Sequence, residues 1–417
     1  MTDSGETVST AFNTTWRNRS ERSIAQGALT NSKRPQSFVD GIYPTHLSHG
    51  KGAFVYCADT GKRYVDFICG LGSNLFGYGN EEIAKAVSQA YLMGSALSLG
   101  SPLEVECAEL LQAAMPWVKR TKFLKTGSEA CSAAIRIARA ATGRNLVISA
   151  DYHGWHDSFV SLSDPAKGVP KLPNCSNLFV EKMGGAHSYR DVAALIIEPV
   201  VTDWSEERRQ RLIELQDLCR RNGTWLILDE VITGYRWPKL SVSRWAGLEP
   251  DLICLGKSIG GGMPLAAVCG RDAKAMDDPE YFVSSTFAGD RTALAAFKAI
   301  HGMMKRPQWD VDDLWERGKL FIANFNRLME GIVSIEGYPT RGVLKGEPER
   351  KAIFMQEACK AGLLFGPSFF FGFQHRELVD EVLGVLKDIS LKIRLGGVSL
   401  EGALPASPFA QTVRGNT

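Results

Sequence analysis

The strongest constraint on the fold is a series of short, continuously apolar segments between residues 122 and 270. They alternate with longer amphipathic stretches and lack the polar–apolar alternation of a strand that faces water. Strands that are apolar on both faces are typical of a largely parallel sheet covered by helices. The sequence therefore predicts an α/β fold. The predicted strands are residues 146–148, 178–180, 193–197, 225–228, 252–255 and 265–269.

Helix and turn signals divide the rest of the chain. Ser205 and Gly223 bracket a helical pattern as N-cap and C-terminal stop. An Asp-Thr-Gly turn at residues 59–61 separates two β-rich runs, which predicts a hairpin. With 417 residues, two domains are expected. The predicted segments are an N-terminal arm with part of a small domain (1–70), a large domain (71–305), a C-terminal small domain (306–395) and a flexible tail (396–417).

Charge and cysteine content exclude several classes of protein. The 48 Lys and Arg nearly balance the 46 Asp and Glu, so no basic surface for nucleic acid is expected. The nine cysteines contain no C-x-x-C pair, which argues against zinc ribbons and disulfide scaffolds. No apolar stretch is long enough to span a membrane, and the N-terminal residues lack the apolar run of a secretory signal. We expect a cytoplasmic protein that binds neither nucleic acid nor membrane.

Chemistry-bearing residues cluster near predicted strand ends, where open α/β sheets place their ligands. Gly127 and Ser128 open a helical segment directly after a strand-like run. Free backbone N–H groups at a helix start form a seat for a phosphate. Alternatively, Ser128 only caps the helix.

A second feature is the segment with Tyr152, His153, Gly154 and His156, just past the predicted strand 146–148. An aromatic ring beside a glycine can offer a flat face to a planar ligand. The two histidines could instead bind zinc, although no third ligand accompanies them. The simplest alternative is that these side chains only pack over the sheet edge.

Two further strand ends carry ionisable groups. Asp229 and Glu230 end the run 225–228, and a buried carboxylate there needs a cation or hydrogen-bond donors. Magnesium binding or a solvated strand end are alternatives. Lys257 follows the run 252–255, and a desolvated lysine suits a Schiff-base nucleophile. A lone lysine at such a place can also be an ordinary surface residue.

Together, a phosphate seat, an aromatic face, a strand-end acid and a desolvated lysine describe the requirements of pyridoxal 5'-phosphate. Their order and spacing resemble the class III, fold-type I aminotransferases, and most of all glutamate-1-semialdehyde 2,1-aminomutase and its relatives. The resemblance runs from about residue 51 to 387. It implies a mostly parallel sheet of the seven-stranded type, with a smaller α+β domain formed by the N- and C-terminal segments.

The resemblance also implies a role for individual residues. Lys257 matches the Schiff-base lysine that moves the substrate proton, and Asp229 matches the acid paired with the pyridine nitrogen. Thr286 matches a threonine that reaches the cofactor phosphate of a neighbouring subunit, which implies a homodimer. The remaining residues that the resemblance assigns to cofactor binding are Gly127, Ser128, Tyr152, His153, Glu198 and Val231.

Departures from the family pattern concern substrate recognition. After Phe287 the family usually has Gly-Asn-Pro, whereas this chain has Asp290 and Arg291 after Gly289. The segment 233–236 resembles the aminomutase-like branch. We expect an aminotransferase that moves an amino group from a small-molecule donor to an aldehyde or ketone acceptor, such as a keto-sugar or pathway aldehyde. The alternatives are an intramolecular aminomutase and, remotely, a metal-dependent hydrolase built on Asp229, Glu230, His153 and His156.

Overall fold

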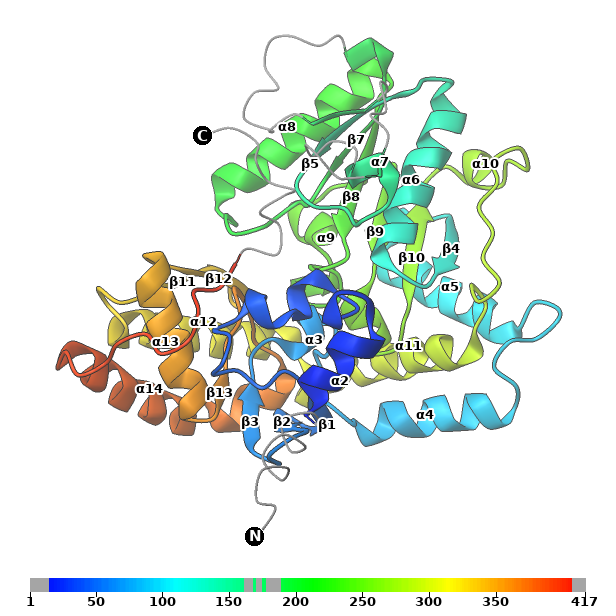
Figure 1. Ribbon diagram of the computed structural model, residues 1–417. Helices are drawn as coiled ribbons and strands as arrows, with labels where there is room; N and C mark the ends of the chain where they lie inside the picture. Colours follow the sequence, from blue (N-terminus) through cyan, green and yellow to red (C-terminus); the bar gives the residue numbers. More distant parts are fainter. Residues whose placement is uncertain (1–14, 161–167, 170–174, 178–188, 407–417) are drawn as a thin grey trace. The chain divides into compact units, whose positions relative to one another are not determined.

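The computed structural model describes residues 15–160, 168–169, 175–177 and 189–406, and the chain forms two compact units (Figure 1). The larger unit consists of Gly70–Phe76 and Asn80–Glu316. The smaller unit combines the described residues before Gly70, the short segment Gly77–Gly79 and the described residues from Arg317 onward.

A seven-stranded sheet forms the centre of the larger unit. Strand β10 runs antiparallel to both of its neighbours, and the other neighbouring strands are parallel. The mostly parallel seven-stranded sheet predicted from the sequence is therefore confirmed. In spatial order the strands are β4 (Arg120–Leu124), β10 (Ala266–Gly270), β9 (Leu252–Leu255), β8 (Trp225–Glu230), β7 (Val192–Ile197), β5 (Leu146–Ala150) and β6 (Cys175–Asn177). The strand predicted at 178–180 lies outside the described residues.

Two long helices flank this sheet, α6 (Gly127–Thr142) and α8 (Glu206–Asn222) (Figure 1). Every residue of β7, β9 and β10 is buried, as their unbroken apolar sequences predict. The Ser205 side chain accepts a hydrogen bond from Arg208 N, and Gly223 ends α8 in the left-handed conformation with φ of 64°. Both helix-end predictions are confirmed.

The larger unit contains further helices besides α6 and α8. No helix among the described residues is long and apolar enough to cross a membrane. The remaining helices are α4 (Glu81–Leu92), α5 (Pro102–Ala114), α7 (Asp157–Val160), α9 (Val242–Ala246), α10 (Ala273–Met276) and α11 (Arg291–Met303). Helices α3 (Cys69–Gly72) and α12 (Val311–Leu328) each contain residues of both units.

The smaller unit holds two small sheets around an aromatic core. Phe67 stacks against Phe365 at 4.8 Å and against Phe369 at 5.4 Å between ring centroids. The predicted hairpin is present as antiparallel β2 and β3. One sheet is β1 (Leu47–Lys51), β2 (Phe54–Cys57), β3 (Arg63–Asp66) and β13 (Leu363–Leu364); the other is β11 (Ser334–Tyr338), β12 (Arg341–Lys345) and β14 (Ser368–Phe370). Its helices are α2 (Trp16–Ser23), α13 (Pro348–Lys360) and α14 (Val379–Arg394).

The segment after α14 packs within the smaller unit. The buried side chain of Gln356 donates to Ser399 O at 2.9 Å and accepts from Glu401 N at 2.8 Å. Ala403 pairs with Asp40 in an isolated antiparallel bridge. Residues 399–403 thus have specific partners, and the flexibility of the tail from residue 396 stays a prediction.

Candidate active site

The start of α6 combines a capping box with free backbone donors. Thr126 Oγ1 accepts from Glu129 N at 3.2 Å, and the Glu129 carboxylate accepts in return from the N–H groups of Lys125 and Thr126. Thr126, and not Ser128, therefore caps the helix. Among the described residues, no hydrogen bond occupies the N–H groups of Gly127 and Ser128. This is the arrangement that binds phosphate at helix N-termini.

Close contacts bring four segments together around this helix start. A Cβ at Gly127 would lie 2.8 Å from Val231 Cγ1, and one at Gly256 would lie 3.1 Å from the same atom. A Cβ at Gly154 would lie 2.3 Å from Ser128 Oγ. The ends of β4, β5, β8 and β9 therefore converge on one place, and glycine is required at Gly127 and Gly154.

Asp229, near the end of β8, is the centre of a buried hydrogen-bond cluster. Its Oδ2 atom lies 2.7 Å from His153 Nδ1 and accepts from Cys131 Sγ at 3.3 Å. Its Oδ1 atom accepts from Val231 N at 3.1 Å. These contacts satisfy a carboxylate that is only 5% exposed, as a buried anion requires.

The geometry around His153 gives its charge state. Nε2 lies 2.5 Å from Ala150 O, and Nδ1 faces the Asp229 carboxylate. Both partners are hydrogen-bond acceptors, so these contacts favour the doubly protonated imidazolium form of His153. Burial alone would lower the pKa of His153, but the hydrogen bond to Asp229 and the negative charges of Asp229 and Glu198 outweigh it. The pKa of His153 is consequently raised above 6.5.

Tyr152 and Glu198 lie beside this cluster. Tyr152 is half exposed, and it follows Asp151, whose φ of 78° is unusual for a residue other than glycine. The backbone N–H of Glu198 donates to the Asp151 side chain. Burial, the largest factor, raises the pKa of Tyr152, and the charges of Cys131, Asp229 and Glu198 add to it. Tyr152 and Asp151 thus lie close enough to Asp229 for its negative charge to raise their pKa.

Lys257 enters the same region from β9. It begins the 3-10 turn Lys257–Gly260, directly after Gly256, and it is partly buried. Its φ of 47° lies in the left-handed region, which costs about 1 kcal/mol or more for a residue with a Cβ. The contact of Gly256 with Val231 links this turn to the strand end that carries Asp229.

The contacts of Glu230 give it a structural role. Its carboxylate is fully buried, and the burial, which is only partly offset by hydrogen bonds, raises its pKa. It caps α9 and accepts from four donors: Thr233 Oγ1, Ser241 Oγ, Val242 N and Ser243 N.

The four proposed ligands of a metal-dependent hydrolase do not form one cluster, because, of these four described side chains, only those of Asp229 and His153 contact each other. His156 Nδ1 pairs with Ser132 Oγ at 2.8 Å. Within the described residues, the cluster with metal-ligand spacing is Cys131, His153 and Asp229, without Glu230 or His156.

Thr286 lies apart from these contacts. It is exposed in the loop between α10 and α11, and no contact among the described residues joins it to the Asp229 cluster.

The departure from the family pattern after Gly289 has a clear structural role. Asp290 forms an ion pair with Lys125 at 2.7 Å, and Arg291 donates to Met93 O and Gly94 O.

The sequence interpretation missed two residues of this site. Cys131 was one of nine scattered cysteines, yet it donates to Asp229 from one turn into α6. Its position four residues after Gly127, on the helix face that covers the sheet, was the available signal. Thr126 was overlooked as the helix cap although Glu129, three residues later, completes a capping-box pattern.

Fold and site together define the fold-type I class of pyridoxal-phosphate enzymes. Within this class, the chain belongs to the aminotransferase class-III family, whose model matches residues 39–369. Its cofactor is pyridoxal 5'-phosphate.

The relatives found by sequence include several glutamate-1-semialdehyde 2,1-aminomutases. The Aquifex aeolicus enzyme is 30% identical over 412 residues, which cover 88% of this chain and 96% of the relative. The Symbiobacterium thermophilum enzyme is 35% identical over 280 residues, covering 62% of this chain and 64% of the relative. That match thus spans slightly less than two thirds of the relative's length.

Solved structures share the fold at lower identity. The FumI protein of Sphingopyxis sp. MTA144 superposes with a TM-score of 0.82 and 23% identity, covering 92% of this chain and 97% of that one. A glutamate-1-semialdehyde aminomutase from Pseudomonas aeruginosa gives a TM-score of 0.76 and 20% identity, covering 89% and 92%. An omega-transaminase from Sphaerobacter thermophilus gives 0.79 and 23%, covering 91% and 97%.

The residues present fit this cofactor. The open N–H groups at Gly127 and Ser128 suit a phosphate. Gly127 and Gly154 let the segments of Val231 and Ser128 approach closely, which holds this helix start in place. The Asp229 carboxylate suits a protonated pyridine nitrogen. The half-exposed Tyr152 offers a ring for stacking.

Replacing Gly154 by alanine tests this fit. Because the new Cβ would collide with Ser128, we expect the dissociation constant for pyridoxal phosphate to rise at least about tenfold. Gly143→Ala is the matched control, since Gly143 also has a positive φ but open space around it. It should lower stability by about 1 kcal/mol and leave cofactor affinity unchanged. Cofactor titration of the apoenzyme and thermal melts separate the two effects; equal affinities in both variants would contradict the assignment.

Proposed function

We propose that the protein is an aminotransferase that moves an amino group from a small-molecule donor to an aldehyde or ketone acceptor. The observation that carries the proposal is the convergence of the Gly127 helix start, the Asp229 cluster and the Lys257 turn at the strand ends of one sheet. When bound, pyridoxal phosphate supplies an electron sink for the pair released as a substrate Cα–H bond breaks.

Each side chain then has a defined task. Lys257 Nζ carries the cofactor at rest and moves the proton at the substrate Cα. Asp229 holds the proton at the pyridine nitrogen, and His153 and Cys131 hold the Asp229 carboxylate in place. Gly127 and Ser128 bind the phosphate, and we place Tyr152, Glu198 and Val231 around the ring.

The acceptor is proposed to be a specialised biosynthetic aldehyde or ketone. The support comes from the segment around Asp290 and Arg291, where this chain differs from the usual family pattern. Because Asp229 and Lys257 are unchanged, we propose that this difference alters substrate recognition and not the transfer chemistry. The contacts of Asp290 with Lys125 and of Arg291 with Met93 and Gly94 shape this region.

Donor dependence tests the proposed function. We expect that an amino donor alone converts the bound cofactor to its amino form in a single turnover, and that an aldehyde or ketone acceptor restores the visible absorbance. Absorbance spectroscopy with a panel of donors follows both steps. A protein that no donor converts, but that isomerises an amino aldehyde without any external amine, would contradict it.

An intramolecular aminomutase is the second candidate, because the sequence relatives carry the name glutamate-1-semialdehyde 2,1-aminomutase. It would use the same residues, but it would move an amino group from one carbon of its substrate to the neighbouring carbon. The donor experiment separates it from the first candidate.

We further propose that the protein is a homodimer, with Thr286 of one copy reaching the cofactor phosphate of the other. Support comes from large apolar side chains exposed around the loop between α4 and α5 and in the segment that precedes α11. Arg291 joins these two regions by binding Met93 O and Gly94 O. The exposed residues are Tyr91, Leu92, Met93, Leu97, Leu99, Val105, Phe282 and Phe287.

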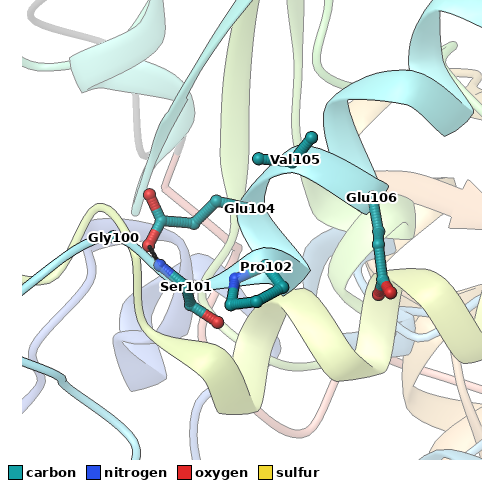
Figure 2. A pocket seen from close by; sticks show the side chains of 6 residues that line it. All are labelled: Gly100, Ser101, Pro102, Glu104, Val105 and Glu106. Atoms are coloured by element: carbon teal, nitrogen blue, oxygen red, sulfur yellow. Dashed lines mark hydrogen bonds between the residues drawn. The ribbon is translucent and has the colours of Figure 1, made fainter.

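An open hollow of about 580 Å³ lies within this surface, at the start of α5. Figure 2 shows Gly100, Pro102 and Val105 at the hollow, with the Glu104 side chain turned back to the backbone of Ser101. A cluster of exposed large apolar side chains of this kind is typical of an interface.

Introducing charge into this surface should separate the copies. We expect the double variant Leu92→Glu, Leu99→Glu to have half of the wild-type molar mass. Both side chains are 85% exposed in a single copy, and the introduced charges would be buried between two copies. Leu395→Glu is the control, since Leu395 is 86% exposed on the smaller unit. Light scattering after gel filtration gives the mass; a wild-type monomer, or an unchanged mass in the double variant, would contradict the dimer.

A further inference from the structure

A buried arginine contacts the residue that follows Lys257. Arg236 is 1% exposed and lies after β8, in the segment that resembles the aminomutase-like branch. One terminal nitrogen of its guanidinium donates to Gly72 O at 2.5 Å and to Ser258 Oγ at 3.2 Å. Arg236 therefore joins the Gly72 segment to the lysine turn within the larger unit.

The backbone of Arg236 is fixed as firmly as its side chain. Its N–H donates to Thr233 O at 3.1 Å, and its carbonyl accepts from Trp315 Nε1 at 2.9 Å. The preceding Tyr235 has a φ of 60° and pairs with His301 Nδ1 at 2.7 Å. Because these hydrogen bonds fix the backbone of Arg236, its guanidinium can hold the Ser258 side chain in one position.

The lysine turn needs such an anchor. Lys257 has an unfavourable positive φ, and the same turn leads into Gly261 and Gly262 with φ of 55° and 98°. Glycine adopts such angles at little steric cost, whereas Lys257 does so only where its surroundings hold it. Ser258 directly follows Lys257, is fully buried and accepts the hydrogen bond from Arg236.

We propose that Arg236 is a positioning residue for Lys257: through its hydrogen bond to Ser258, it holds the Lys257 backbone in the left-handed conformation and so directs Nζ toward the cofactor site. The inference rests on the proposed role of Lys257. A misdirected Nζ would still be present but would react slowly, because rates depend steeply on the orientation of the reacting group.

A double-variant cycle tests this. The probe is pyridoxal phosphate added to apoenzyme, and the readouts are the rate at which the visible band forms, the peptide that borohydride labels, and kcat with KM. We expect Arg236→Met and Ser258→Ala each to slow band formation and kcat about tenfold. KM should change less than about twofold, and the double variant should be no slower than the slower single one. Arg236→Lys, which can reach one acceptor, should be intermediate.

Two outcomes would overturn the inference. Wild-type rates in Ser258→Ala, a small change that should not prevent folding, would show that Lys257 does not depend on this contact. Rate losses that multiply in the double variant would show that Arg236 and Ser258 act independently. Arg244→Met, an exposed arginine on α9, is the control and should keep wild-type rates. Absence of a label on Lys257 in the wild type would instead overturn the proposed function itself.

Discussion

Replacing Lys257 by alanine is expected to lower kcat/KM for amino transfer by at least about a thousandfold. In the proposed mechanism, the variant loses both the amine that carries the cofactor and the group that moves the substrate proton. It should still fold, because alanine removes only a partly buried side chain in the turn that follows β9. The cofactor should still bind non-covalently, since Asp229 and the Gly127 helix start remain.

The control for this experiment is Lys274→Ala, an exposed lysine on α10 of the same unit. We expect its kcat/KM to stay within about twofold of the wild type. Activity assays at saturating cofactor, together with circular dichroism, distinguish a loss of catalytic activity from a loss of folded structure. Turnover by Lys257→Ala at the wild-type rate would remove Lys257 from the mechanism.

The second large effect is expected for Asp229→Asn. Because the proposed role of this carboxylate is to stabilise a proton on the pyridine nitrogen, kcat should fall by about a hundredfold or more without it. The amide fits the same space and can still bond to Val231 N. The loss should therefore appear in kcat more than in stability, and Asp272→Asn, an exposed helix cap, is the control.

The same variant has a predictable effect on stability against pH. His153 has a raised pKa in the folded protein, so the charged pair with Asp229 stabilises the fold fully below the unfolded-state pKa near 6.5. This contribution is lost as the pH rises through the higher folded-state pKa. The melting temperature of the wild type should therefore exceed that of Asp229→Asn most at about pH 6 and less at about pH 9. A difference that grows with pH would mean that His153 is neutral.

The fold could be predicted because its signals are local in the sequence. Unbroken apolar runs predicted strands β5, β7, β8, β9 and β10, of which β10 is antiparallel to its neighbours. Ser205 and Gly223 predicted both ends of α8. The strand-end positions of Asp229 and Lys257 followed from the same pattern, since parallel strands present their carboxyl ends at one edge.

The contacts that complete the site are not local, and the sequence alone did not reveal them. Cys131 and Asp229 are 98 residues apart, and Arg236 reaches back 164 residues to Gly72. Such pairs depend on how helices pack against the sheet, which no short motif records. For Glu230 the sequence was misleading, because its position beside Asp229 suggested a functional role. Its carboxylate instead accepts from four donors and caps α9.

The most direct test of the account is to reduce the holoenzyme with borohydride and map the modified residue by mass spectrometry. We predict that the cofactor becomes covalently fixed to Lys257 Nζ and to no other lysine. A label on Lys125, which lies next to the α6 helix start, or no label at all in a protein that binds the cofactor, would contradict it.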